Sequence, residues 1–184
     1  ISESGWRESS AEGGPIQKLV AGGRTVVAVD VSGIGELASD KGVWYNQRFG
    51  SEGKNATVAY LLGRSLTGIR CEDILATAQW LHKQREGERV ELIARGNLGP
   101  AALHAAALEP AMFSKVKLER SLTSFTSLVE TPVTDDRWQH VVHGALRAYD
   151  LPDLASTLGD RVEWIEPVDA SGKVLIQETT EETE

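Results

Sequence analysis

The chain has 184 residues, of which 41% are hydrophobic and 25% are charged, a balance typical of one globular domain with a single core. Its formal net charge of -8 argues against a nucleic-acid partner, because such binding needs clustered Lys and Arg. No apolar run approaches the roughly 20 residues of a membrane helix, so we expect no membrane partner. The single Cys71 excludes an internal disulfide, and we expect it in the core.

The first third of the chain mixes loops with one helix and one strand. The opening ISESGW is typical of a strand end that passes into a loop, so we expect a longer protein, and Ile1 to Gly14 is predicted as a loop. Pro15 to Ala21 is predicted as a short helix, because Pro suits a first helical turn. Thr25 to Val31 is β-branched and apolar, which predicts a strand buried on both faces. Glu36 to Asn55 shows no period, and we expect a long irregular segment there.

The remaining sequence alternates helices and strands. The predicted helices are Ala56 to Leu62, about Ile69 to Gln84, Ala101 to Leu108, Thr131 to Tyr149 and Leu151 to Leu158. The predicted strands are Val90 to Ala94, Val116 to Leu118 and Val162 to Ile165. Together with Thr25 to Val31, this alternation predicts an α/β domain of three αβα layers around a mostly parallel sheet.

The segment RVELIARGNLGPAALHAAAL, from Arg89 to Leu108, has the strand, turn and helix of a nucleophile elbow. An elbow of the form Gly-x-Ser-x-Gly carries its serine at the tip of the bend. Here Ala94 takes the place of the first glycine and Gly96 takes the place of the serine. Glycine has no atom that attacks an ester, so the bend is predicted to lack its nucleophile.

With this bend and the stretches VVAVDVSGIGE, GRSLTGIRCEDILATAQWL, LHAAALEP and EPVDASGK, the chain resembles the α/β-hydrolase family. Within that family it is similar to the acetyl-xylan-esterase-like hydrolases. The resemblance implies a partial α/β-hydrolase fold over residues 1–176, whose four predicted strands are the fourth to seventh of the family. Residues 177–184 are predicted to be an acidic, disordered tail.

The resemblance also implies partners and a location. The family's first three strands would precede Ile1, and the third normally lies between the strands that Thr25 to Val31 and Val90 to Ala94 represent. The sheet would then have a gap, so we expect another chain, or a missing N-terminal segment, to complete it. A carbohydrate ester is the ligand that the family implies, with a secreted or periplasmic location and no cofactor.

By the same resemblance, Asp169 holds the acid position of a catalytic triad and Gly96 the nucleophile position. The family order places the histidine last, and no histidine follows His143. A Ser-His-Asp mechanism therefore lacks both its nucleophile and its base. The main hypothesis is a non-catalytic, esterase-like domain of a larger protein or assembly.

Two alternatives stay open. The first is an active carboxylic-ester hydrolase of the acetyl-carbohydrate type, completed by segments outside this chain. The second is a small anion- or sugar-binding module. Its anion would bind the turn that contains Arg95, Asn97 and Leu98, where backbone N–H groups open a helix, and Trp44 would stack on a sugar.

Other chemically suggestive residues are predicted to have structural roles. Ser65 is expected at a helix boundary, and Gly33 and Gly35 are expected in a turn that needs positive φ. His140 and His143 could share a metal, but we predict surface histidines and no metal site. Two arginines are expected to form structural ion pairs with acidic residues, and these are Arg64 and Arg70 with Glu72 and Asp73.

Overall fold

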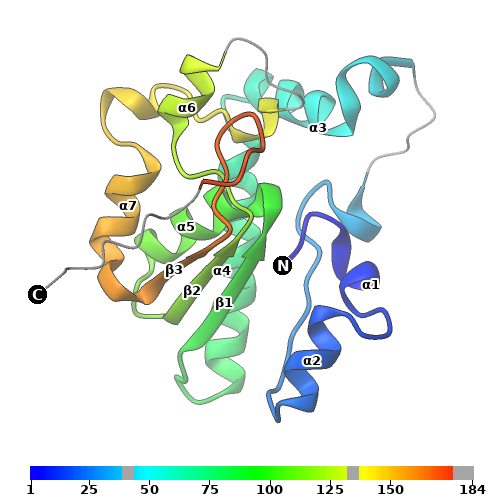
Figure 1. Ribbon diagram of the computed structural model, residues 1–184, viewed down its shortest axis with the longest axis vertical. Coiled ribbons are helices and arrows are strands. Elements are labelled where there is room, and N and C mark those ends of the chain that lie inside the picture. The colour runs from blue at the N-terminus through cyan, green and yellow to red at the C-terminus, as the bar shows by residue number, and fades with distance from the viewer. Residues whose placement is uncertain (39–43, 132–136, 176–184) are drawn as a thin grey trace, which may run out of the picture.

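A three-stranded parallel sheet organises the fold (Figure 1). The strands β1 (Val90–Arg95), β2 (Phe113–Glu119) and β3 (Val162–Ile165) lie in the order β1-β2-β3, and helices pack around them. The computed structural model describes residues 1–38, 44–131 and 137–175, and only the backbone of 44–51, 137 and 138. This mixed α/β architecture is consistent with the predicted three-layer class.

Seven α-helices lie within the described residues. They are α1 (Gly5–Ser9), α2 (Pro15–Ala21), α3 (Trp44–Leu61), α4 (Leu66–Gln84), α5 (Gly99–Leu108), α6 (Phe125–Glu130) and α7 (Leu151–Leu158). The short 3-10 turns are η1 (Gly35–Leu37), η2 (Gly96–Leu98), η3 (Arg137–His140), η4 (Ala145–Arg147) and η5 (Gly159–Arg161). The predictions for α2, α7 and β3 are confirmed to the residue, and those for β1, β2, α4 and α5 are confirmed with shifted ends.

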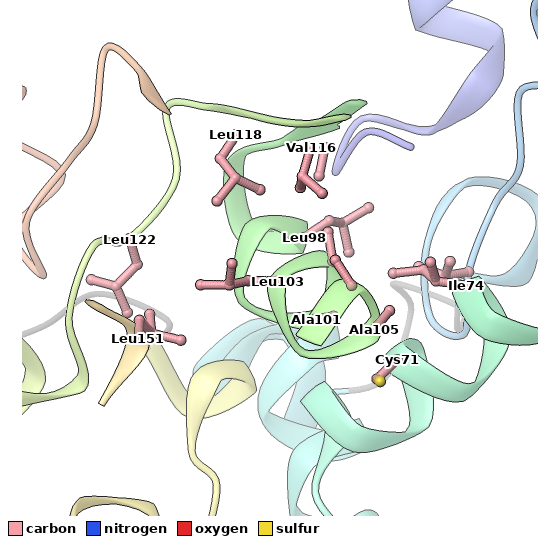
Figure 2. Close-up of a cluster of buried hydrophobic side chains, with 14 of the residues drawn as sticks. Cys71, Ile74, Leu98, Ala101, Leu103, Ala105, Val116, Leu118, Leu122 and Leu151 are labelled. Carbon is pink, nitrogen blue, oxygen red and sulfur yellow. The ribbon is translucent and has the colours of Figure 1, made fainter. Parts of the chain in front are cut away.

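Helix α5 lies at the centre of the hydrophobic core (Figure 2). It contacts β1, β2, α4 and α7, and it is buried almost all round, as its alanine-rich sequence predicts. Small side chains permit this close approach. Gly99 is required at the start of the helix, because a Cβ there would overlap the Ser121 side chain. Cys71 packs against the same helix and is buried, as predicted.

The two faces of the sheet differ in chemistry because strand side chains alternate. Leu92, Ala94, Val116 and Leu118 belong to the core or pack against it. Their neighbours on the other face form ion pairs, of which Lys117 joins β1 to β3 with its Nζ 3.1 Å from Glu91 and 3.9 Å from Glu163. Lys115 with Glu163 and Arg95 with Glu119 extend the same row.

Two predictions for the first third of the chain are wrong. The expected loop at Ile1 to Gly14 contains α1, and Ile1–Ser2 pairs with β1. The expected irregular segment is helical from Trp44, and α3 continues to Leu61, so the helix predicted for Ala56 to Leu62 is confirmed except at its last residue. The sequence does not predict the first part of α3, because its glycines and polar residues have low helix propensity, and contacts with η3 help to stabilise the helix.

Two further predicted elements are also wrong. Thr25 to Val31 is extended but belongs to no sheet within the described residues. A β-branched run favours extended backbone, yet it becomes a strand only when a neighbour pairs with its edge. The helix predicted for Thr131 to Tyr149 is replaced, in its described part, by η3 and η4. Gly144 adopts a left-handed conformation between them (φ 76°), which interrupts any helix.

Candidate functional site

The predicted bend is present at the end of β1. The strand ends at Arg95, Gly96 begins the single turn η2, and α5 starts at Gly99. Gly96 has φ +60°, in the left-handed region where side chains other than glycine are strained. The sequence therefore predicts the strand, turn and helix correctly, and the residue at the tip adopts the conformation that a sharp elbow requires.

The carboxylate of Glu3 fills the space that a side chain at position 96 would need. A Cβ built on Gly96 would overlap the carboxyl group of Glu3. The same carboxylate accepts a hydrogen bond from the backbone N–H of Asn97, with 2.7 Å between Asn97 N and Glu3 Oε2. A negative group is favoured here, because the free N–H groups of a helix start carry partial positive charge. The predicted anion seat is therefore occupied by the chain's own Glu3.

The three predicted ligand-binding residues at the bend point to different partners. Arg95 forms an ion pair with Glu119 on β2. The side-chain Oδ1 of Asn97 lies 3.2 Å from Nε2 of His140. Leu98 is fully buried and packs in the core (Figure 2). The structure thus places Arg95 in the ion-pair row on the sheet and Asn97 beside a buried imidazole.

The two histidines considered as a metal pair lie in different surroundings. His140 is only 1% exposed, so the prediction of a surface residue is wrong for it, because η3 turns it toward Asn97. His143 is exposed, as predicted, and its ring lies 4.5 Å from that of Tyr60. No group of three or more His, Cys, Asp or Glu suited to a metal ion occurs in the described part of the chain.

Asp169, at the predicted acid position, is used by its own loop. Its Oδ1 accepts hydrogen bonds from the backbone N–H and hydroxyl of Ser171 and from the N–H of Lys173, at 2.8, 2.6 and 3.0 Å. The hydrogen bond from the Ser171 hydroxyl is the main cause that lowers the pKa of Asp169 below its ordinary value, so the group is ionised. The carboxylate therefore stabilises a tight turn.

His104 also has local partners. Its Nδ1 lies 2.6 Å from the carbonyl oxygen of Pro100, and its Nε2 lies 2.7 Å from the hydroxyl of Tyr149. Burial lowers the pKa of His104, so the neutral imidazole is favoured. This pair joins α5 to the segment before α7.

Arg70 connects the turn that contains Ser32 with helix α3 and with the turn η3. Its guanidinium donates to the Ser32 carbonyl (3.0 Å) and to Oε1 of Gln139 (3.3 Å), and it forms an ion pair with Glu52. Because Gln139 precedes His140 in η3, Arg70 holds that turn against α3 and α4. Arg70 therefore forms a structural ion pair, as expected, but the predicted partner is wrong, because the pair is with Glu52 and not with Glu72 or Asp73.

The remaining structural expectations are confirmed. Arg64 pairs with Glu72. Ser65 caps α4 by accepting the N–H of Gly68 at 3.0 Å. Gly33 and Gly35 have φ +82° and +55° in the turn after residue 31. The sequence does not identify Glu3 as a residue of this site, because no local pattern connects it with Asn97, which lies 94 positions later.

No helix within residues 1–38, 44–131 and 137–175 is both long and apolar enough to cross a membrane. Comparisons with protein families, with curated proteins and with solved structures found no match.

Proposed function

We propose that this chain is a non-catalytic domain with a partial α/β-hydrolase fold, esterase-like in origin, which serves assembly within a larger protein. The observation that carries this proposal is the Glu3 carboxylate at the bend, which lies against Gly96 and accepts the backbone N–H of Asn97. Acyl transfer by this type of fold needs a nucleophile at that tip and a base to activate it. Gly96 supplies no nucleophile, and a carboxylate occupies the space where one would stand.

The surroundings of the bend support the same proposal. The charge of Asp169 stabilises a turn with Ser171 and Lys173. His104 is held by Pro100 and Tyr149, in a setting that favours the neutral ring. These contacts account for the Asp169 carboxylate and for the partly buried imidazole of His104 without a catalytic role.

The active-hydrolase alternative is separated from this proposal by a serine-directed fluorophosphonate probe. We expect no labelled serine in the intact mass spectrum, and hydrolysis of p-nitrophenyl acetate at the rate of heat-inactivated protein. The reason is that no activated hydroxyl stands at the bend. A serine esterase labelled in parallel is the positive control. Labelling of one serine, with loss of hydrolysis on labelling, would contradict the non-catalytic proposal.

The role of Glu3 is tested by placing a side chain at the bend. Gly96→Ser is expected to lower the free energy of unfolding by roughly 2 kcal/mol, from positive-φ strain and from overlap with Glu3. Gly13→Ser is the matched control, because Gly13 has φ +72° and a Cβ added there would meet nothing within 4 Å. Unfolding in urea measures both variants.

A double-mutant cycle isolates the Glu3 contribution. Glu3→Ala should relieve the overlap, so Gly96→Ser should cost less in that background, by about 1 kcal/mol. The cost of Gly13→Ser should be the same in both backgrounds. Equal costs of Gly96→Ser with and without Glu3 would show that the carboxylate does not fill the bend. Neither Gly96 variant is expected to gain ester hydrolysis.

The alternative of an anion-binding module is weakened by the same geometry. An external carboxylate or phosphate would compete with Glu3 for the N–H of Asn97, and Glu3 is held there intramolecularly. For the sugar-binding version, the side chain of Trp44 lies outside the described residues. Assembly is therefore the function that the geometry favours.

A further inference from the structure

A groove lies between β1 and the extended segment 24–31, and we call it the β1 groove. Its cavity volume is about 800 Å³, and α2 and α4 also contribute to its walls. Figure 1 shows segment 24–31 running beside β1, with the N-terminus of the chain between them. This volume lies within the range of ligand-binding pockets in proteins.

The edge of β1 that faces this groove has backbone groups ready to pair. In a parallel ladder, alternate residues direct their N–H and C=O to the same side. Val90 donates to the Met112 carbonyl next to β2, at 2.9 Å, so Glu91, Ile93 and Arg95 point toward the groove. Within the described residues, hydrogen bonds satisfy this edge only at its far end, through Ile1.

Ile1 fixes the direction and register of a strand in the groove. Its nitrogen donates to the Ile93 carbonyl at 2.8 Å, and its carbonyl accepts from Arg95 N–H at 3.2 Å. Ser2 forms a parallel bridge with Arg95. These are the bonds of a parallel strand whose final residue is opposite the end of β1. A strand continuing from the Ile1 nitrogen would run along the open edge of β1, opposite Val90 to Ile93.

The opposite wall of the groove also lacks a neighbour. Segment 24–31 runs in the same direction as β1, because Arg24 pairs with Glu91 at one end and Asp30 accepts the N–H of Trp6 at the other, at 2.8 Å. The backbone N–H and C=O groups from Val26 to Val29 form no hydrogen bond with the described part of the chain. Val27 is 46% exposed, although it lies in an apolar, β-branched run of the kind that forms buried strands.

The lining of the groove indicates an apolar occupant. Leu92 and Ile93 of β1, Val27 and Val29 of the facing segment, and Ile74 of α4 line the cavity. Several charged residues also line it. Glu91 pairs with Arg24 and Lys117, and Arg95 pairs with Glu119. The others, Lys18, Arg85, Glu88 and Arg89, are exposed to solvent. A charged strand would lose hydration beside side chains that are already paired, whereas β-branched apolar residues would fill the space.

We propose that the β1 groove binds an apolar β-strand joined by a peptide bond to Ile1, parallel to β1 and paired on its other edge with segment 24–31. About four residues fit opposite Val90 to Ile93, at roughly 3.3 Å a residue. A strand of another chain would have to end or turn at Ile1, whereas a strand joined to Ile1 needs no turn. The inference rests on the assembly role proposed above and not on the absence of catalysis.

The test compares the chain carrying Val-Val-Ile-Val before Ile1 with the chain carrying Gly-Ser-Gly-Ser there. With the apolar extension, amide hydrogen exchange at Ile93 and at alternate residues between Thr25 and Val29 should slow by roughly tenfold or more, because these N–H groups become paired. The melting temperature should rise as well. If both extensions leave these amides equally fast, the proposal is overturned.

A matched pair of variants ties the effect to the groove. Val27→Lys places a charge in the groove wall, and Val20→Lys places the same side chain at a position on α2 that is 54% exposed. Val27→Lys should remove the gain in protection given by the apolar extension, and Val20→Lys should retain it. Both positions are exposed, so both variants are expected to fold. Equal behaviour of the two variants would contradict the proposed site.

The covalent source of the strand has its own control. The peptide acetyl-Val-Val-Ile-Val-amide is added to the unextended chain, and the same amides are followed. We expect no protection at a concentration equal to that of the protein, because a joined strand benefits from a high effective concentration. Protection by the free peptide would contradict the proposal that the strand must be joined to Ile1. Ester hydrolysis tests the non-catalytic proposal separately. A negative result for the strand in the β1 groove would therefore not contradict the non-catalytic role, and detected hydrolysis would not contradict the strand.

Discussion

Arg70→Ala is expected to lower the free energy of unfolding by about 3–5 kcal/mol, the largest effect of any substitution considered for this chain. Arg70 is 1% exposed, and its guanidinium is bonded to the Ser32 carbonyl, to Gln139 and to Glu52. Truncation removes the cation that faces the largely buried Glu52. It also removes the hydrogen bond that Arg70 donates to the Ser32 carbonyl.

Urea unfolding, supported by the melting temperature, measures this effect. A loss of this size corresponds to a fall of the melting temperature on the order of 10 °C for a chain of this length. Arg64→Ala is the control, because the ion pair of Arg64 with Glu72 is exposed, and it should cost less than about 1 kcal/mol. Arg70→Lys should lie between them, since an ammonium keeps the charge but not the planar fork.

Two outcomes would contradict this account. A cost of Arg70→Ala as small as that of Arg64→Ala would mean that burial of the guanidinium contributes little. Full stability of Arg70→Lys would mean that the charge alone is needed and the bonds to Ser32 and Gln139 are not.

Elements whose ends are determined by local chemistry could be predicted from the sequence. Helix α7 begins after the capping residue Asp150, has Pro152 in its first turn and ends before Gly159. Residues adjacent in the sequence therefore determine both of its ends. The bend at Gly96 is another such case, because a partly buried strand, a glycine turn and an alanine-rich helix follow one another directly.

Elements that depend on distant partners could not be predicted in this way. The run from Thr25 to Val31 has the composition of a buried strand, and the structure leaves it extended beside an open groove. Composition reports that a segment would be stable in a sheet. It does not report whether a neighbour is available to pair with it.

The candidate site shows the same limit. The sequence identifies Gly96 and the N–H groups after it. The carboxylate that accepts one of these N–H groups belongs to Glu3, which is 94 positions from Asn97 in the sequence. Pairing of Ile1–Ser2 with β1 delivers Glu3 to the bend. Burial of His140 is equally non-local, because Arg70 and Gln139 set the position of η3.

The second large effect is expected at Asp150, which connects two helices through one carboxylate. It caps α7 by accepting the Leu151 N–H at 2.6 Å. It also accepts from Ser124 Oγ at 2.6 Å, from Phe125 N at 2.6 Å and from Thr126 N and Oγ1 at 3.1 and 2.8 Å, at the start of α6. Asp150→Asn should therefore cost about 2–3 kcal/mol near neutral pH, because an amide replaces charge-assisted acceptors.

The pH dependence of that cost identifies its origin. Burial disfavours the charged form of Asp150, but hydrogen bonds from Ser124, Phe125, Leu151 and Thr126 outweigh it and lower the pKa from 3.8 to about 2. A lowered pKa means that the unfolded state takes up a proton first as pH falls. The stability from Asp150 is therefore complete above about pH 4 and is lost as pH falls toward 2.

Unfolding of wild type and Asp150→Asn, measured from pH 6 down to pH 2, tests this directly. The difference in free energy of unfolding should be largest at pH 6 and should shrink by about 2 kcal/mol by pH 2. Asp169→Asn is the control, because Asp169 also has a lowered pKa but, among the described residues, its carboxylate bonds only within its own turn. Its effect should be smaller, since no second element separates when that turn opens. A pH-independent cost of Asp150→Asn would show that shape, and not charge, joins α6 to α7.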